Sequence, residues 1–600
     1  MNFLPFCNSL FKYKRNDTLE VIVGNLKIGG NNPIIIQSMT TTDTMDTDAT
    51  VNQCVSVFKA GGEMVRITAQ GQREAANLEV IKEMISKRGY TFPLVADVHF
   101  NPSVALLAAK YADKVRINPG NFSDNPLKLI PFLETCKKYD TAVRIGVNHG
   151  SLSNRILSEY GDTPEGMVES CLEYMRVCRN EGFKNIVLSI KSSNTRVMVH
   201  TVRLLVAKMK QENMNFPLHL GVTEAGSGED GRIKSAVGIG ALLTDGIGDT
   251  IRVSLTEPPE NEIPVAKTLV EHYKSFENHT PIEPVSNFIY TPYIFVKRNS
   301  HQVLSFGGSN NPLVVADLRG TNININFSNI PDVVILDKPY NYNNQNFNNI
   351  IQIIPAKNAR IKTENKVLFL YKKTEIENIK TFEPVVIELK YTDLDDEIID
   401  FLKKRKDVII LLTTGNKNGT SEQRAFFLKM DCNKLTHPVI IHRKYDTNNE
   451  ELFRIKSAAD TGMLFLDGFG DGISLSDQNI DSDVLIETHF LILQAARARF
   501  SKTEFISCPG CGRTLFDLQS TEKKIKEQIS HLKGLKIAIM GCIVNGPGEM
   551  ADADYGYVGA AAGKISLYKN RELVSKNIPE KNAVDELIEL IKKSGDWKNY

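Results

Sequence analysis

The chain has 600 residues, of which 42% are hydrophobic and 24% are charged, and its formal net charge is +1. A chain of this length is too long to fold around a single hydrophobic core, so we expect two to four domains. The near-zero net charge argues against a nucleic-acid or membrane surface spread over the whole molecule. No apolar run approaches the ~18 residues of a membrane span, and the chain starts with apolar and then basic residues, the reverse of a secretory signal. We therefore expect a cytoplasmic protein.

Residues 33–256 alternate short apolar runs with stretches of helical period. The eight runs read PIIIQSM, EMVRITA, PLVADVHF, KVRINPG, AVRIGVN, NIVLSIK, PLHLGVTEA and DTIRVSLT. Eight strand–helix units in a segment of this size favour a closed (β/α)8 TIM-like barrel over a doubly wound open sheet. We predict a substrate-binding barrel domain over residues 1–280.

Polar and charged side chains gather toward the carboxyl ends of these predicted strands. Side chains two residues apart share a face of a strand, and barrel enzymes place their chemistry at the carboxyl ends of the strands. The candidate site residues are Arg66, Asp97, His99, Arg116, Asn118, Arg144, Asn148, Lys191, Thr223, Glu224 and Ser254. Four of the strands each supply a cation to the polar face. A ligand site explains this arrangement better than a set of separate, solvated residues at the barrel rim does.

Short apolar runs return between residues 288 and 476, with an Asn-rich stretch at 340–349 that we predict to be a surface loop. Within this region, SAADTGMLFLDGFGDGISLS from Ser457 resembles SAVGIGALLTDGIGDTIRVS from Ser235. Both copies keep the pattern Asp-Gly-x-Gly-Asp, but Ser474 stands where the first copy has Arg252. We therefore predict that residues 281–485 form an inserted, degenerate α/β barrel-like domain that serves spacing or packing and not catalysis.

The last predicted domain, residues 486–600, is α/β and carries three closely placed cysteines. CPGCGRT contains Cys508 and Cys511, and GCIVNGPGE supplies Cys542 at the end of a predicted strand. Three cysteines in two loops suit an iron–sulfur cluster or a Cys₃ zinc site. No fourth Cys or His lies nearby, and the Gly- and Pro-rich loops let backbone N–H groups approach sulfide and thiolate. We favour a cluster with one open iron. Glu549 follows Cys542 closely enough in the sequence to reach that iron.

Two other functions remain open on these residues alone. An open iron can act as a Lewis acid in a hydro-lyase without redox change, and dependence on an electron donor distinguishes that case. A zinc-stabilised binding protein would be colourless and stable in air. The chain contains no C-x₃-C-x₂-C motif, which disfavours a radical-SAM enzyme, and no P-loop motif.

Long strings at both ends of the chain resemble the 4-hydroxy-3-methylbut-2-enyl diphosphate synthase family of the non-mevalonate isoprenoid pathway. The resemblance rests on QSMTTTDTMD, RITAQ, ADVHFNP, VRINPGN, RIGVNHGSL, GDTIRVSLT, CPGCGRTLFDLQ and GCIVNGPGEMADADYGYVG. The large central insertion resembles the three-domain form of the family.

The resemblance implies an oxidoreductase with a [4Fe–4S] cluster. The expected reaction is the reductive ring opening and dehydroxylation of 2-C-methyl-D-erythritol 2,4-cyclodiphosphate to 4-hydroxy-3-methylbut-2-enyl diphosphate. Flavodoxin or ferredoxin would deliver two single electrons, and the implied cluster ligands are Cys508, Cys511, Cys542 and Glu549. The implied catalytic residues are Glu549, Glu224 and His99. The substrate would be bound by Arg66, Asp97, Arg116, Asn118, Arg144, Asn148, Lys191, Thr223 and Ser254.

Barrel and cysteines lie far apart in the sequence, so the chain must bring them together in space. We expect domain closure with the barrel mouth facing the cluster. In two-domain relatives the cluster comes from the partner subunit of a homodimer. The insertion here is expected to let one chain close on itself, and a homodimer remains the alternative.

Overall fold

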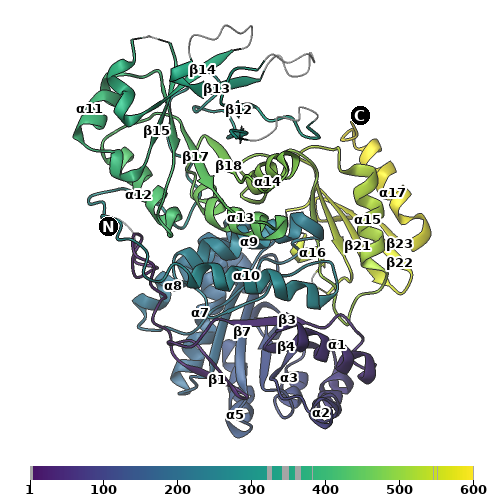
Figure 1. The fold of residues 1–600 in the computed structure, drawn as a ribbon. Helices are drawn as coiled ribbons and strands as arrows, with labels where there is room; N and C mark the ends of the chain where they lie inside the picture. Colours follow the sequence, from purple (N-terminus) through teal and green to yellow (C-terminus); the bar gives the residue numbers. More distant parts are fainter. Residues whose placement is uncertain are drawn as a thin grey trace. The chain divides into compact units, whose positions relative to one another are not determined.

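The computed structural model describes residues 4–320, 327–340, 350–358, 366–380, 383–544, 546–550 and 552–598. The chain divides into two compact units (Figure 1). The barrel–cysteine unit comprises Pro5–Asn8, Arg15–Val270 and Phe500–Tyr600, and the insert unit comprises Met1–Leu4, Ser9–Lys14 and Glu271–Arg499. The cysteine-bearing segment is thus part of the same unit as the first barrel. The insert unit starts before the predicted boundary at 281 and ends after the one at 485.

The first barrel confirms the predicted (β/α)8 fold. Its eight strands pair in parallel in the order β8-β7-β6-β5-β4-β3-β10-β9, and a bridge between Leu188 and Leu218 joins the two ends of the sheet. The strands are β3 (Ile35–Met39), β4 (Met64–Ala69), β5 (Leu94–Val98), β6 (Lys114–Ile117), β7 (Ala142–Asn148), β8 (Ile186–Lys191), β9 (His219–Leu220) and β10 (Thr250–Ile251). Each of the eight predicted apolar runs contains one of them.

Helices follow the strands along the chain, as the helical period of the intervening segments predicts. They are α1 (Thr47–Ala60), α2 (Gln72–Lys87), α3 (Pro102–Ala108), α4 (Pro119–Phe122), α5 (Ile130–Lys138), α6 (Asn154–Tyr160), α7 (Pro164–Asn180), α8 (Thr195–Gln211), α9 (Gly228–Thr244) and α10 (Glu262–Lys274). Several start at a residue whose side chain accepts a hydrogen bond from the first turn, for example Asp46 before α1 and Asn194 before α8.

Aliphatic side chains close the amino-terminal end of the first barrel. The hairpin β1 (Val21–Val23) and β2 (Leu26–Ile28) packs with the first residues of the barrel strands, including Ile35 and Val95, in a fully apolar cluster. Since this end is filled, polar side chains of the barrel interior can meet a ligand only from the carboxyl end.

The insert unit contains a second, closed eight-stranded parallel barrel, which confirms the predicted barrel-like insertion. Its strands are β11 (Leu313–Asp317), β12 (Val333–Ile335), β13 (Ile351–Pro355), β14 (Val367–Lys372), β15 (Val385–Leu389), β16 (Val408–Leu412), β17 (Val439–Lys444) and β18 (Gly472–Ser476). Its helices are α11 (Asp396–Lys404), α12 (Gly419–Cys432), α13 (Glu450–Leu466) and α14 (Ser482–Ala495). The predicted Asn-rich loop at 341–349 lies outside the described residues.

Each barrel has an aspartate at the end of the repeated Asp-Gly-x-Gly-Asp pattern, and the two aspartates make equivalent hydrogen bonds. Asp249 accepts a hydrogen bond from the Leu218 N–H at 2.9 Å and one from the Thr18 hydroxyl at 3.0 Å. Asp471 accepts the corresponding bonds from the Val439 N–H at 2.9 Å and from a serine hydroxyl at 2.6 Å. In each barrel the carboxylate ties the next-to-last strand to the segment that precedes the first strand. The pattern is therefore structural.

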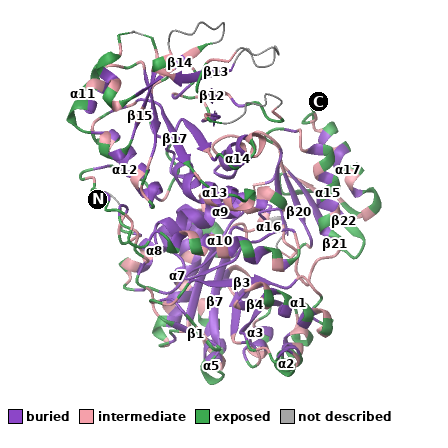
Figure 2. Ribbon diagram, in the orientation of Figure 1, coloured by how far each residue is buried: buried purple, intermediate pink, exposed green. Residues whose placement is uncertain are grey.

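The interiors of the two barrels differ. The second barrel is filled by a cluster of buried aliphatic side chains that includes Val315, Ile335, Val386, Ile409 and Ile440. Most strand residues of both barrels are buried (Figure 2), although the last residues of β14 and β17 are exposed. The second barrel keeps the scaffold of the first, but Ser474 stands at the position that Arg252 has in the first barrel.

The cysteine-bearing segment forms a five-stranded sheet in the order β19-β20-β21-β22-β23, with the first three strands parallel and the last two antiparallel. The strands are β19 (Glu504–Ser507), β20 (Lys536–Met540), β21 (Tyr555–Ala561), β22 (Lys564–Lys569) and β23 (Glu572–Pro579). Helices α15 (Leu518–Ile529) and α17 (Glu580–Lys593) pack on the sheet through apolar residues such as Ile525 and Leu587. The short helix α16 (Gly546–Glu549) follows the loop that contains Cys542.

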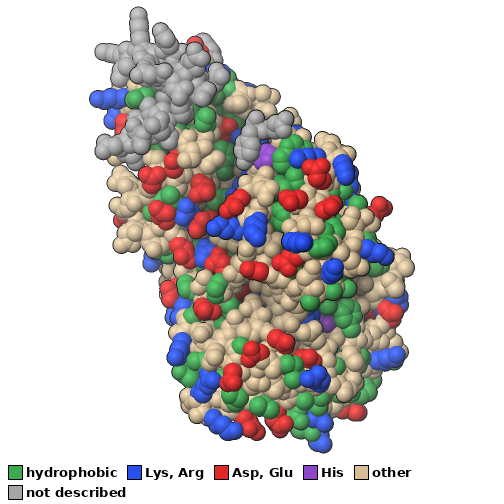
Figure 3. Space-filling model, turned by 90° about the vertical axis from the view of Figure 1, so that its right-hand side faces the viewer, with side chains coloured by type: hydrophobic (Ala, Val, Ile, Leu, Met, Phe, Trp, Pro, Cys, Tyr) green, Lys and Arg blue, Asp and Glu red, His purple; other side chains and the backbone are tan. Residues whose placement is uncertain are grey.

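The described surface carries mixed charge. Lys and Arg side chains are interspersed with Asp and Glu side chains over the face in Figure 3, in line with the net charge of +1. Within the described part of the chain, no helix is both long and apolar enough to span a membrane.

Asp249→Ala is expected to lower the free energy of unfolding by about 2–4 kcal/mol, because it leaves the buried Leu218 N–H without an acceptor and removes the ion pair of Arg15. Asp249→Asn keeps one acceptor oxygen and serves as the control, with a smaller loss. Urea denaturation followed by circular dichroism measures both. An alanine variant within ~0.5 kcal/mol of the parent chain would show that the repeated carboxylate has no structural role.

Candidate active site

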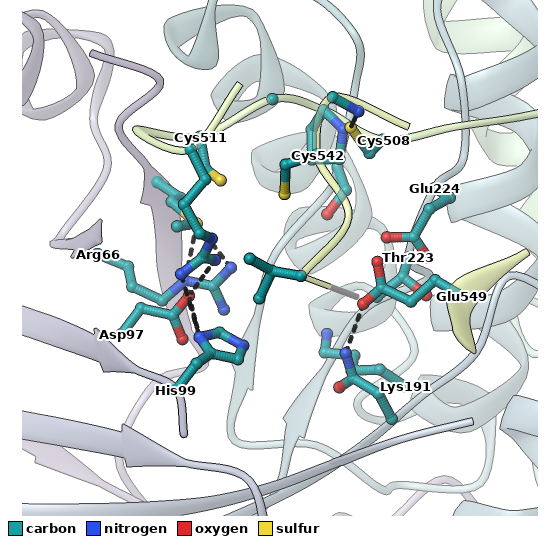
Figure 4. A pocket seen from close by; sticks show the side chains of 18 of the residues that line it. Arg66, Asp97, His99, Lys191, Thr223, Glu224, Cys508, Cys511, Cys542 and Glu549 are labelled. Atoms are coloured by element: carbon teal, nitrogen blue, oxygen red, sulfur yellow. Dashed lines mark hydrogen bonds and ion pairs between the residues drawn. The ribbon is translucent and has the colours of Figure 1, made fainter. Parts of the chain in front are cut away.

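A pocket with about 790 Å³ of empty space lies at the carboxyl end of the first barrel (Figure 4). Barrel side chains line one part of it, and the two cysteine loops line the other. Two segments that are hundreds of residues apart therefore meet in space, as expected from the sequence, and in this structure both belong to one chain.

The pocket gathers all but one of the candidate residues. It is lined by Arg66, Asp97, His99, Arg116, Arg144, Asn148, Lys191, Thr223, Glu224, Ser254, Cys508, Cys511, Cys542 and Glu549. Asn118 is the exception. Its side chain caps helix α4 by accepting a hydrogen bond from the Gly120 N–H at 3.2 Å, and it donates to the Ser151 hydroxyl at 3.0 Å. In the structure Asn118 thus has a capping role, and its substrate role stays a prediction.

Five further side chains with sulfur or nitrogen groups line the pocket, namely Met39, His219, Arg252, Arg513 and Met540. Arg252 shares a strand face with Ser254, so the rule of alternation that selected Ser254 also points to Arg252. Arg513 comes from a loop of the cysteine-bearing segment, where no periodicity indicates the direction of its side chain.

Three barrel cations that line the pocket form no ion pair with a carboxylate among the described residues. Arg144 is 1% exposed, donates from Nε to the Ser189 hydroxyl at 2.9 Å and leaves Nη1 without a hydrogen-bond partner. Burial, together with neighbouring cations, lowers the pKa of Lys191 well below its ordinary value. Burial likewise lowers the pKa of Arg66 to about 10. Because buried like charges are unfavourable without a counter-ion, this part of the pocket is suited to an anion with several oxygens.

The remaining cations of the pocket are paired. Arg252 forms an ion pair with Glu262 at 3.1 Å. Arg116 and Arg513 both pair with Asp97, at 3.3 Å and 3.2 Å. Burial alone would raise the pKa of Asp97, but the surrounding guanidinium groups outweigh it and hold that pKa well below its usual range. Asp97 is therefore ionised at neutral pH.

The three candidate thiols face the same pocket (Figure 4). Cys508 follows strand β19, and its sulfur accepts a hydrogen bond from the Gly541 N–H at 3.2 Å. Burial raises the pKa of the Cys508 and Cys542 thiols, so their thiolates need positive charge nearby. Arg513 lies close enough to Cys542 to oppose that rise in pKa.

The thiols fit a cluster better than a single metal ion. One tetrahedral zinc ion requires ligand atoms within about 4 Å of each other, since each Zn–S bond is about 2.3 Å. Among the described residues, no group of three or more His, Cys, Asp or Glu side chains has such an arrangement. Thiolates that bind different irons of one cluster have no such restriction. The glycine N–H at Cys508 supplies the kind of hydrogen bond that iron–sulfur sites use.

Glu549 and Glu224 form a carboxyl pair at the edge of the cysteine loops (Figure 4). Asn148 donates a hydrogen bond to Glu549 Oε1 at 2.6 Å. Burial and the charge of Glu549 raise the pKa of Glu224 well above its ordinary value. Glu224 has a φ of +49°, a conformation that is rare for residues other than glycine and that occurs at functional sites. The pair offers a buried carboxyl that holds a proton at neutral pH.

Close backbone contacts join the cysteine loops to the barrel. The Thr256 hydroxyl donates to the Cys508 carbonyl at 3.1 Å, and the Gln70 amide donates to the Gly512 carbonyl at 3.0 Å. Gly150 of the barrel lies directly against Gly548, so a Cβ atom at position 150 would overlap the Gly548 carbonyl. Only glycine allows this approach of the loop that carries Glu549.

Gly150→Ala is expected to displace the loop that contains Gly548 and Glu549, because the new methyl group overlaps that loop. Hydrogen–deuterium exchange should show at least tenfold faster exchange in the peptide that contains both residues. Gly182→Ala is the matched control, because Gly182 also has a positive φ, of +64°, but has no atom within 4 Å of an added Cβ. Unchanged exchange in Gly150→Ala would contradict the close contact.

Comparisons with known proteins match both parts of the barrel–cysteine unit. The model of the GcpE TIM-barrel domain matches residues 18–267, and that of the GcpE protein C-terminal domain matches residues 504–593.

Full-length relatives carry one name. A protein of Parabacteroides distasonis named 4-hydroxy-3-methylbut-2-en-1-yl diphosphate synthase (flavodoxin) is 50% identical, and the alignment covers 98% of this chain and 100% of the relative. Relatives of the same name from Phocaeicola vulgatus and Leptospira interrogans are 50% and 39% identical. Those alignments cover 98% and 100% of this chain, and 99% of each relative.

Proposed function

The chain belongs to the 4-hydroxy-3-methylbut-2-en-1-yl diphosphate synthase (flavodoxin) family, and on this premise we propose how its pocket performs a reductive ring opening. The proposed substrate is 2-C-methyl-D-erythritol 2,4-cyclodiphosphate, and the product is 4-hydroxy-3-methylbut-2-enyl diphosphate. The reaction takes up two electrons and two protons and releases water. The supporting observation is one pocket that contains unpaired buried cations beside three thiols.

Cys508, Cys511 and Cys542 would hold a [4Fe–4S] cluster, with Glu549 as a replaceable fourth ligand. When bound, such a cluster supplies single electrons and one iron with an exchangeable coordination position. The proposed donor of these electrons is flavodoxin, which the names of the relatives contain.

The barrel cations would bind the diphosphate. Arg66, Arg144 and Lys191 form no ion pair among the described residues, and a diphosphate supplies the missing negative charge. Guanidinium groups bind phosphate oxygens with two parallel hydrogen bonds, which fixes the orientation of the ligand as well as its position. Asp97 and Thr223 would orient the polyol part of the substrate, with His99 beside Asp97.

Glu224 would hold the proton that the departing hydroxyl group needs. Its carboxyl lies beside Glu549, and burial favours its protonated form. A buried acid at this place can protonate an oxygen atom as its bond to carbon breaks. Asn148 would keep Glu549 oriented through its hydrogen bond.

The alternative of a hydro-lyase without redox change is tested by the requirement for an electron donor. Anaerobically purified protein should convert the cyclic diphosphate with reduced flavodoxin and should be inactive without a reductant. Turnover without any reductant would support the hydro-lyase instead.

Cys542→Ser is expected to remove most of the cluster and at least 99% of the activity, because two thiolates remain to hold it. The parent chain should contain about four iron and four acid-labile sulfide atoms per chain. Cys432→Ser is the control, since Cys432 is an exposed thiol of the insert unit. Iron and sulfide analysis measures both variants. A parent protein with zinc and no acid-labile sulfide would rule out the proposed chemistry.

A mixture of Cys542→Ser chains and Arg144→Ala chains is expected to remain inactive. The thiols and Arg144 line the same pocket of one chain, so neither variant can complete the site of the other. The activity of the mixture after joint denaturation and reconstitution measures this. Activity well above that of the separate variants would show that two chains share their sites.

A further inference from the structure

Arg513 connects the cysteine loop to the substrate side of the pocket. It follows Cys511 by two residues, and its side chain is 9% exposed. One end of the guanidinium, Nη1, lies 3.1 Å from His99 Nδ1, and the other, Nη2, donates to Asp97 Oδ2 at 3.2 Å. Arg513, which lies in the loop that contains Cys511, therefore contacts the two barrel residues Asp97 and His99.

Arg116 contacts the same two barrel residues from inside the barrel. A neutral imidazole accepts a hydrogen bond at one ring nitrogen only, so His99 accepts from either Arg116 or Arg513, whereas Asp97 accepts from both. Arg116 Nη1 lies 3.3 Å from Asp97 Oδ1 and 2.7 Å from His99 Nε2. Arg116 is fixed in turn by the Gly146 carbonyl and the Asn148 side chain, each at 3.1 Å. Because Arg116 is anchored, it holds Asp97 and His99 in place. Arg513 therefore contacts two side chains whose positions are fixed.

Arg513 also brings positive charge to the thiols. Its charge interacts with the sulfurs of Cys511 and Cys542 as well as with Asp97. A positive charge in a poorly solvated site favours any step that adds negative charge nearby. Iron–sulfur potentials respond to net charge and to hydrogen bonds around the cluster.

We propose that Arg513 is a positioning residue that fixes the cysteine loop against Asp97 and His99 and makes one-electron reduction of the cluster more favourable. This inference rests on the proposed function, because it requires that the three thiols hold an iron–sulfur cluster. In the step concerned, the reduced donor loses one electron and the cluster gains it, and no covalent bond changes. The positive charge of Arg513 compensates the added negative charge.

The test is a potentiometric titration of anaerobically reconstituted protein, followed by electron paramagnetic resonance. Arg513→Gln should lower the equilibrium constant for reduction at least tenfold, which is 59 mV for a one-electron couple. Arg513→Lys keeps the charge and should restore most of the difference. Lys502→Gln is the control: it removes another cation of the cysteine-bearing segment that pairs with a barrel carboxylate, Asp230 at 2.9 Å, but that does not line the pocket. Its potential should equal that of the parent chain.

Asp97→Asn supplies a second test, in which the potential is expected to shift in the opposite direction. This test does not depend on the stability of the Arg513 variants. Removal of the carboxylate leaves the charge of Arg513 uncompensated, so reduction should become more favourable. An unchanged potential in Arg513→Gln that retains its cluster would overturn the inference. If that variant holds no cluster, an unchanged or lower potential in Asp97→Asn would overturn it. A parent chain without acid-labile sulfide would instead refute the proposed function, and this is seen before any variant is measured.

Discussion

Buried positive charge at the carboxyl end of the first barrel is the constraint on which the site depends. Arg144 and Lys191 lie inside a folded barrel without a carboxylate partner among the described residues, although burial disfavours their charged forms. Such an arrangement is tolerated when the surrounding scaffold is rigid and a ligand supplies the missing charge. The aliphatic cluster at the opposite end of the barrel and the ion pairs of Asp97 and Arg252 supply that rigidity.

The second barrel shows that the fold itself does not require these cations. Asp249 and Asp471 make equivalent hydrogen bonds, so the repeated segment preserves the closure of both barrels. Where the first barrel has Arg252, the second has Ser474, whose hydroxyl lies 3.1 Å from His442 Nδ1, and a cluster of aliphatic side chains packs inside the second barrel. A filled apolar interior stabilises a barrel without any ligand. The interior cations of the first barrel are therefore best explained by the binding of an anionic ligand.

Most of the fold and much of the site could be predicted from the sequence. Alternation along the strands identified Arg66, Arg144 and Lys191, because side-chain direction in a strand follows directly from position. Asn118 follows the same rule, but a proline immediately after it starts a helix, and the asparagine side chain is used to cap that helix. The role of Arg513 could not be predicted, since the direction of a side chain in a Gly-rich loop depends on tertiary contacts. The exact limits of the compact units also depend on such contacts.

The central claim is that the diphosphate bound by the barrel cations lies next to the cluster held by the cysteine loops of the same chain. The most direct measurement is the electron paramagnetic resonance spectrum of the reduced protein with and without the cyclic diphosphate. The account predicts that saturating ligand changes the spectrum and that Arg144→Ala abolishes the change at the same concentration. A spectrum that is identical with and without bound ligand would contradict it.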